Sequence, residues 1–282
     1  MEVRPASVAP GVERFAALTP TLPPATHTNS YAIGEREVVL IEPATPYEDE
    51  KREWLAWAEG IRSSGRKLVA ILATHHHPDH VGGVAFFKEA LGLPLWAHER
   101  ATRFLKVSVD RALADGDTID LVGQVTQRWQ VMHTPGHASD HICLLEQAAR
   151  TVIVGDMVAS VGTILIAPGD GDMIDYMAQL KRLEELDAEV ALPAHGAPIA
   201  APSRLFRAYQ AHRSMREAWV LKAVEKLAGE AGATLDEILP VAYAGTDETL
   251  YPIARMSLEA HLDKLEHEGA VRRQDGRYSR AA

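Results

Sequence analysis

The chain has 282 residues, 46% of them apolar, and its 29 lysine and arginine residues against 39 aspartate and glutamate residues give a formal charge of −10. This length and apolar content suit one substantial α/β domain with a small appendage and exclude a disordered chain. From Ser203 onward there are 12 basic and 12 acidic residues, so the net charge belongs to residues 1–202, where an acidic surface does not attract a polyanion.

The start of the chain predicts its location. The first ten residues lack the positive flank and apolar core of a signal peptide, and no run approaches the roughly 20 apolar residues of a membrane span. We therefore expect a soluble cytoplasmic protein with no membrane partner. The single cysteine, Cys143, lies in an apolar run, where a buried thiol is expected.

Along the first part of the chain, predicted strands alternate with predicted helices, which is the pattern of an α/β fold. In chain order these elements are strand 38–41, helix 48–61, strand 68–74, helix 84–91, strand 93–97, helix 99–105, a run of strands within 118–154, helix 174–186 and strand 189–192.

The segment 74–83 reads Thr-His-His-His-Pro-Asp-His-Val-Gly-Gly and follows the apolar run 68–73. Within six positions it offers four side chains with metal-binding chemistry: His75, His77, Asp79 and His80. Histidine and aspartate at this density suit zinc, while manganese or iron also accepts nitrogen and oxygen ligands. The sequence therefore predicts a metal site at the end of this strand.

The spacing within this segment has a physical reason. Because side chains alternate along an extended segment, His75 and His77 point the same way and can bind one metal. Pro78 is tolerated at a helix start, so Asp79 and His80 can open the next element at a second metal.

Three later predicted strands also end at a metal-binding residue, as two zinc ions require. The strand-like run 127–133 breaks at Thr-Pro-Gly and presents His137. The β-branched run 151–154 is followed by glycine and Asp156, and the next apolar run ends at Pro-Ala-His195. We expect these side chains to complete the site.

Together these segments resemble the metallo-β-lactamase superfamily, at residues 74–80, 134–137, 155–156 and 193–196. The resemblance implies a four-layer αββα sandwich with two metal ions. It implies that the first ion is bound by His75, His77 and His137, and the second by Asp79, His80 and His195. It also implies that Asp156 bridges the ions, which together with the missing export signal argues against true β-lactamase activity.

Further segments resemble the branch that contains β-lactamase-like protein 2, which carries a C-terminal winged helix. They are Thr28-Asn29-Ser30-Tyr31, Asp115-Gly116-Asp117, Asp140-His141, Asp175-Tyr176-Met177 and Arg213 to Glu217. One segment departs from the family, because Glu42-Pro43-Ala44 stands where Asp-Thr-Gly is usual. Glutamate is one methylene longer and proline lacks a backbone donor, so the support of the first metal loop is left open.

The tail predicts a second domain. Prolines and small residues near Ser203 mark a boundary, so we predict a catalytic domain at 1–202 and a winged-helix-like domain at 203–282. In the tail, Ser203 can cap a long helix to about residue 227, a capped helix starts at 234–237, and helix 250–267 precedes a hairpin wing.

Four arginines on this wing, Arg272, Arg273, Arg277 and Arg280, are typical of nucleic-acid binding. Carboxylates on the preceding helix repel phosphates, however, at Glu259, Asp263, Glu266 and Glu268. We therefore favour a packing or dimerisation role for the tail, with a homodimer as a predicted partner. Shaping of the substrate cleft and DNA binding are the alternatives.

The predicted reaction is hydrolysis. Two close divalent ions lower the pKa of a bound water and present a bridging hydroxide, which Asp79 would orient. The acidic charge favours a small-molecule ester or thioester as substrate. The resemblance implies cleavage of single-stranded RNA as the alternative, and a metal-containing sensor or adaptor without turnover is a third hypothesis.

Two further residues are candidates for supporting a metal ligand or contacting substrate, Asn29 and His141. His76 is expected to pack behind the metal loop. The other isolated histidines are interpreted as surface residues, namely His27, His98, His212, His261 and His267.

Overall fold

The structure is a computed structural model that describes residues 4–227 and 231–281. It divides into two compact units. The first contains Met1–Thr134, Asp140–Ile164 and Leu186–Ser203, and the second contains Pro135–Ser139, Leu165–Glu185 and Arg204–Ala282. The predicted domain boundary at 202/203 stays a prediction.

A seven-stranded sheet forms one half of the first unit, with its strands in chain order from edge to edge. They are β1 (Ala6–Ala9), β2 (Val12–Leu18), β3 (His27–Ile33), β4 (Glu37–Ile41), β5 (Lys67–Leu72), β6 (Leu95–His98) and β7 (Arg111–Leu113). Neighbours are antiparallel from β1 to β4 and parallel from β4 to β7. Parallel neighbours need a crossover connection, which α1 (Glu48–Ser63) supplies between β4 and β5.

The second sheet has six strands in the order β13-β12-β11-β10-β9-β8. Their bounds are β8 (Thr118–Leu121), β9 (Gln127–His133), β10 (Ile142–Glu146), β11 (Thr151–Gly155), β12 (Val190–Pro193) and β13 (Ile199–Ala200). All neighbours are antiparallel except the parallel pair β11 and β12.

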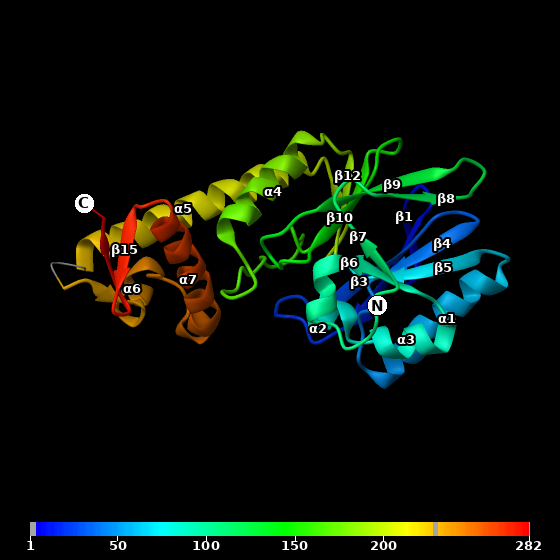
Figure 1. The fold of residues 1–282 in the computed structure, drawn as a ribbon, viewed down its shortest axis with the longest axis horizontal. Coiled ribbons are helices and arrows are strands. Elements are labelled where there is room, and N and C mark those ends of the chain that lie inside the picture. Colours follow the sequence, from blue (N-terminus) through cyan, green and yellow to red (C-terminus); the bar gives the residue numbers. More distant parts are fainter. Residues whose placement is uncertain (1–3, 228–230, 282) are drawn as a thin grey trace. The chain divides into compact units, whose positions relative to one another are not determined.

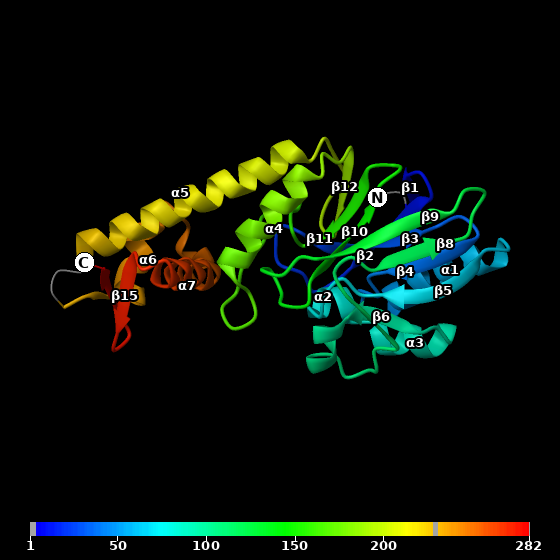
Figure 2. The same ribbon diagram turned by 45° about the horizontal axis from the view of Figure 1, so that its top comes forward.

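The two sheets stack on one another, as Figure 2 shows, because apolar side chains from both face a shared core. Ile41 and Leu72 of the first sheet belong to this core together with Trp129 and Leu144 of the second. Helices α1 and α3 (Val84–Leu91) cover the outer face of the first sheet (Figure 1). Trp54 and Phe87 of these helices belong to the apolar core between them and the sheet. The polar ends of the strands are therefore left to form a site.

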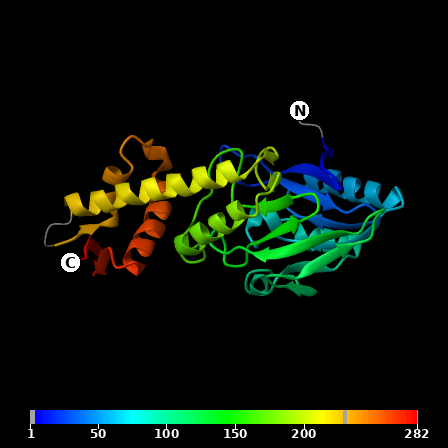
Figure 3. The ribbon, with the colours of Figure 1, turned by 90° about the horizontal axis from the view of Figure 1, so that it is seen from above.

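The second unit contains the tail helices and a small sheet. Its elements are α4 (Met173–Glu185), α5 (Ser203–Leu227), α6 (Leu235–Ala242), η2 (Glu248–Leu250), α7 (Tyr251–His267), and the sheet β14-β16-β15 formed by Ala233–Thr234, Arg277–Arg280 and Val271–Gln274. Val224, Leu258 and Tyr278 share one core, so α5, α7 and the hairpin pack together (Figure 3). The predicted cap of α6 is confirmed, because Thr234 and Glu237 form a capping box.

Most predicted elements are present within two residues at each end, but one predicted helix differs and several strands were not predicted. Residues 99–105 form a 3₁₀ helix, η1, only over Glu99–Arg103. Strands β1 to β3, β7 and the short β13 and β14 are absent from the sequence prediction. In β3 the reason is a buried polar run, Thr28 to Ser30, which breaks the apolar alternation by which a strand is recognised.

Candidate metal centre

The metal loop follows β5 and folds as its sequence predicts. His77 has extended backbone angles and precedes α2 (Pro78–Val81), a single helical turn with proline at its start. Asp79 and His80 therefore open a helix, while His75 remains in the extended segment before it. His75 and His80 are both buried, at 1% and 0% exposure. The loop thus brings together side chains from an extended segment and from a helical turn.

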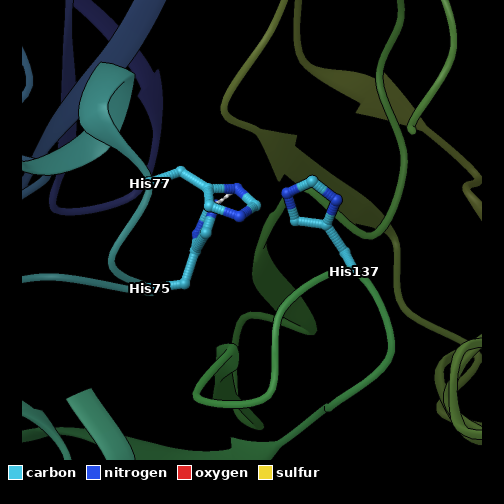
Figure 4. A group of neighbouring side chains, drawn as sticks. All are labelled: His75, His77 and His137. Atoms are coloured by element: carbon cyan, nitrogen blue, oxygen red, sulfur yellow. Dashed lines mark hydrogen bonds between the residues drawn. The ribbon is translucent and has the colours of Figure 1, made fainter. Parts of the chain in front are cut away.

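The two groups of donor atoms that were expected are among four that the described residues form. One ring nitrogen each from His75, His77 and His137 lies within 4.8 Å of the others. Figure 4 shows these imidazoles pointing toward one another. Atoms of Asp79, His80 and His195 form a second group under the same limit.

Asp156 lies against the second group. Its Oδ2 is 3.5 Å from Nε2 of His80, and its Oδ1 is 3.4 Å from Nε2 of His195. Asp79 Oδ2 is likewise 3.5 Å from His195 Nε2 and 3.9 Å from His80 Nε2. The bridging role expected of Asp156 stays a prediction.

These distances test whether the donor set fits a metal. They exceed the usual N–H···O range of about 2.7–3.2 Å. Two ligands at about 2.0–2.1 Å from one tetrahedral zinc lie about 3.3 Å apart, however, close to the spacings around Asp156. The donors are imidazole nitrogens and carboxylate oxygens, which zinc, iron and manganese all accept. The residues therefore fit a divalent metal centre.

The electrostatics of the cluster point the same way. Burial alone would raise the pKa of Asp156, but His195 and His80 beside it hold that pKa well below its usual range. Burial would lower the pKa of His80, whereas Glu42, Asp156 and Asp79 raise it well above the ordinary value. Asp156 is thus buried beside groups that favour its ionised form, which is the form that binds a metal cation.

Glu42, the residue at which the chain departs from the family pattern, reaches this cluster. Its side chain is buried, and Oε1 lies 3.2 Å from Nδ1 of His80. Thr74 Oγ1 donates to the same oxygen, and Ser30 Oγ donates to the backbone carbonyl of Glu42 at 2.5 Å. The backbone of Glu42 is left-handed, with φ 60°. The longer side chain therefore contacts Nδ1 of His80, the ring nitrogen opposite the one that faces Asp156.

His141 and Asn29 hold the segments that carry ligands. The backbone N–H of Asp156 donates to Nε2 of His141 at 3.0 Å, and Nδ1 of His141 is 2.8 Å from Oγ1 of Thr134. Asn29 Nδ2 donates to the carbonyls of Pro193 and Gly196, each at 2.8 Å, on either side of His195. Both residues thus contact ligand-bearing backbone.

Two residues that support the site were not predicted to belong to it. Tyr31 donates its hydroxyl to the carbonyl of Pro193 at 2.7 Å, and Trp54 Nε1 donates to Ser30 Oγ at 2.8 Å. The one available signal was the run of polar residues in β3, which is typical of a buried hydrogen-bonding strand.

Two surface predictions for histidines are wrong. His98 is 5% exposed and stacks on His133 with ring centroids 4.0 Å apart. Burial and the neighbouring His133 lower the pKa of His98 to about 4. His261 is fully buried, and its Nδ1 lies 3.7 Å from Glu217 Oε2. In each case packing from a segment distant in sequence covers the imidazole.

His76 does not simply pack behind the loop as expected. Its Nδ1 is 2.8 Å from Oδ1 of the buried Asp140, and its ring stacks on that of Phe104. The residue therefore joins the metal loop to the segment after β6.

Comparison with known proteins places this site in a family context. The model of the Metallo-beta-lactamase superfamily matches residues 23–195, and that of the Beta-lactamase associated winged helix domain matches residues 234–279. The predicted resemblance and the predicted fold, with its winged-helix tail, are thereby confirmed.

Two curated relatives match most of the chain. The Beta-lactamase-like protein 2 homolog of Drosophila melanogaster is 28% identical over 272 residues, which cover 93% of this chain and 89% of that protein. An atrochrysone carboxyl ACP thioesterase of Aspergillus chevalieri is 26% identical over 267 residues, covering 92% and 80% respectively.

Two solved structures illustrate the similarity in fold. A Beta-lactamase domain protein from Burkholderia ambifaria has a TM-score of 0.83 at 22% identity, over 98% of this chain and 93% of that one. The protein TTHA1623, solved in a di-iron-bound form, has a TM-score of 0.53 at 29% identity, over 66% and 95%. In the described part of the chain, no helix has the length and hydropathy needed to span a bilayer.

Proposed function

Since the chain belongs to the metallo-beta-lactamase superfamily, whose members are generally hydrolases, we propose that it uses two zinc ions to hydrolyse a small ester or thioester. The observation that carries this proposal is the pair of donor groups, each closed to within 4.8 Å, beside the buried carboxylate of Asp156. The di-iron form of TTHA1623 supports a paired metal site of this kind, whereas zinc as the metal is our proposal from the donor types.

The residues of the chain would divide the work between them. Bound divalent ions would supply a water that is acidic at neutral pH and would stabilise developing negative charge on oxygen. Asp79 is the more exposed of the two carboxylates, with 17% of its side chain exposed against 9% for Asp156. Its carboxylate can accept a hydrogen bond from the attacking water and orient it. Asp156 stays ionised and holds His80 and His195 in place.

Thioester hydrolysis is favoured by the charge of the molecule and by one relative. The curated protein from Aspergillus chevalieri bears the name of an acyl carrier protein thioesterase. Residues 1–202 carry the whole formal charge of −10, which disfavours a long polyanion.

The alternative is cleavage of single-stranded RNA, which we retain because the chain resembles the branch of Beta-lactamase-like protein 2. The wing arginines bear on this alternative. Three of them face carboxylates: Arg273 near Asp263, Arg277 near Glu237, and Arg280 near Glu225. Their charge is therefore partly neutralised within the tail.

The first prediction concerns metal content. Metal analysis of the purified protein should give about two ions per chain, as a paired site requires. Asp156→Ala should abolish turnover of a generic acyl thioester while the circular dichroism spectrum stays unchanged. Asp110→Ala, which removes an exposed carboxylate paired with Lys88, is the matched control and should keep full activity. One ion per chain with full activity would contradict the proposal.

Parallel assays decide between the substrate classes. An acyl thioester and a labelled single-stranded RNA should be compared on the same preparation at several salt concentrations. We expect turnover of the thioester with little salt dependence. Cleavage of the RNA alone, lost steeply as salt rises, would replace the proposal by its alternative. Binding of metal without turnover of either would instead support a sensor.

A further inference from the structure

Phe104 is an exposed aromatic residue that is nevertheless held in a defined position. Its side chain keeps 41% of its surface exposed. One face of the ring stacks on the imidazole of His76, with ring centroids 3.8 Å apart and an angle of 12° between the planes. An exposed ring that is held in one position can offer a face on which a planar group stacks.

Both members of this stack are anchored from behind. The backbone N–H groups of Phe104 and Leu105 each donate to the carbonyl of Ala101 at 3.0 Å. Ala101 is buried in the core over the first sheet, and Leu105 packs against it. On the other ring, Nδ1 of His76 lies 2.8 Å from the fully buried Asp140. The stacked rings of Phe104 and His76, called the platform below, are therefore ordered before any ligand binds.

The platform adjoins the metal centre. The rings of His76 and His77 are 4.9 Å apart, so one imidazole separates Phe104 from a predicted metal ligand. A molecule stacked on Phe104 would therefore have its other groups near the reaction site.

Positive charge accompanies this ring in an otherwise acidic part of the chain. Arg103 and Lys106 flank Phe104 in the sequence and are both exposed. In residues 4–227 and 231–281 neither forms an ion pair, whereas Arg52, Arg62 and Lys67 in the same unit are each paired. An exposed ring beside two unpaired cations suits a ligand that is both planar and anionic.

We propose that Phe104, with Arg103 and Lys106, forms a nucleotide-binding subsite in which a base stacks on the ring and a phosphate meets the cations. The chemistry is shared by two sources, the nucleotide end of a coenzyme A thioester and a nucleotide of single-stranded RNA. The choice between them rests on the proposed function, but the subsite itself does not.

Nucleotide binding to the metal-loaded protein tests the proposal without any turnover. Adenosine and AMP are the probes, titrated by calorimetry. Phe104→Ala and Phe104→Leu should each weaken both probes about tenfold, as loss of one stacked base predicts. Arg103→Ala with Lys106→Ala should weaken AMP about fivefold, as loss of charged contacts predicts, and leave adenosine unchanged. Phe86→Ala, at a ring 36% exposed, is the matched control and should bind both normally.

Steady-state kinetics identify the source of the nucleotide. If it belongs to coenzyme A, Phe104→Ala should raise KM for acyl-coenzyme A and not for the same acyl group on N-acetylcysteamine. If it belongs to RNA, the same variant should raise KM for RNA cleavage only. The inference is overturned if wild type binds neither probe, or if Phe104→Ala binds them as well as Phe86→Ala does. Normal turnover of the thioester without AMP binding would contradict the subsite but would leave the proposed function standing.

Discussion

Glu42 shows how a single residue can support a candidate metal ligand. Its Oε1 lies 3.2 Å from Nδ1 of His80, while Nε2 of the same ring faces Asp156 and Asp79. A carboxylate on the far nitrogen fixes the tautomer of a metal-binding histidine and makes its donor nitrogen more basic. Glu42, which directly follows β4, thus supplies the carboxylate that contacts this nitrogen of His80.

Replacing this carboxylate by an amide should weaken metal binding. Glu42→Gln keeps the size of the side chain, so we expect the fold to persist while metal affinity falls about 10–100-fold. Competition with a chromophoric chelator measures the affinity directly. Glu48→Gln, at an exposed glutamate paired with Lys51, is the matched control. Equal affinity of wild type and Glu42→Gln would show that Glu42 only fills space.

At the scale of the element, the ends of strands set the positions of the candidate ligands. Strand β11 ends at Gly155, whose φ of 47° turns the backbone so that Asp156 enters the site. A Cβ atom at this position would lie 2.5 Å from Nε2 of His141 and 3.1 Å from Oγ1 of Thr74. Glycine is therefore required both for its backbone angle and for the close approach of His141.

Gly155→Ala should accordingly destabilise the strand end. We expect a loss of about 1–3 kcal/mol in the free energy of unfolding, because alanine is strained at positive φ and displaces His141. Urea unfolding of the metal-free protein gives this value. Gly60→Ala, in α1 with no atom within 4 Å of the added Cβ, is the control and should stabilise by about 0.5–1 kcal/mol. Similar values for both variants would refute the argument.

For the whole molecule, the metal ions should contribute to stability as well as to chemistry. The donors come from segments as distant in sequence as the loop at His75 and that at His195. Ions that bind only this assembled arrangement stabilise the folded state by mass action.

Chelation should therefore lower the midpoint of thermal unfolding of the wild-type protein. Calorimetry with and without EDTA measures this shift in midpoint. Linkage puts the corresponding loss in the free energy of unfolding at about 2.7 kcal/mol for an ion present at a hundred times its dissociation constant. Asp156→Ala should show a smaller shift, because it has lost a ligand. An unchanged midpoint in wild type would mean that the ions are not coupled to folding. The predicted homodimer and small-molecule substrate remain predictions.

The sequence by itself indicated the candidate metal ligands and predicted the fold around them. His75, His77 and His80 fall at a spacing that only a strand followed by a helix start explains, and Asp156 and His195 directly follow apolar runs. These are local patterns, in which a side chain's chemistry and its place at the end of an element can be recognised together.

Tertiary structure decided what surrounds those candidate ligands. Glu42 meets His80, His141 meets the backbone of Asp156, Phe104 stacks on His76, and His98 and His261 are buried. Each contact joins segments that no periodicity relates, so no local pattern marks its partners. The wing arginines illustrate the same limit, because their pairing with Asp263, Glu237 and Glu225 depends on how the tail packs. Ligand identity is a local property of the chain, whereas support, burial and neutralisation depend on which distant segments the fold brings into contact.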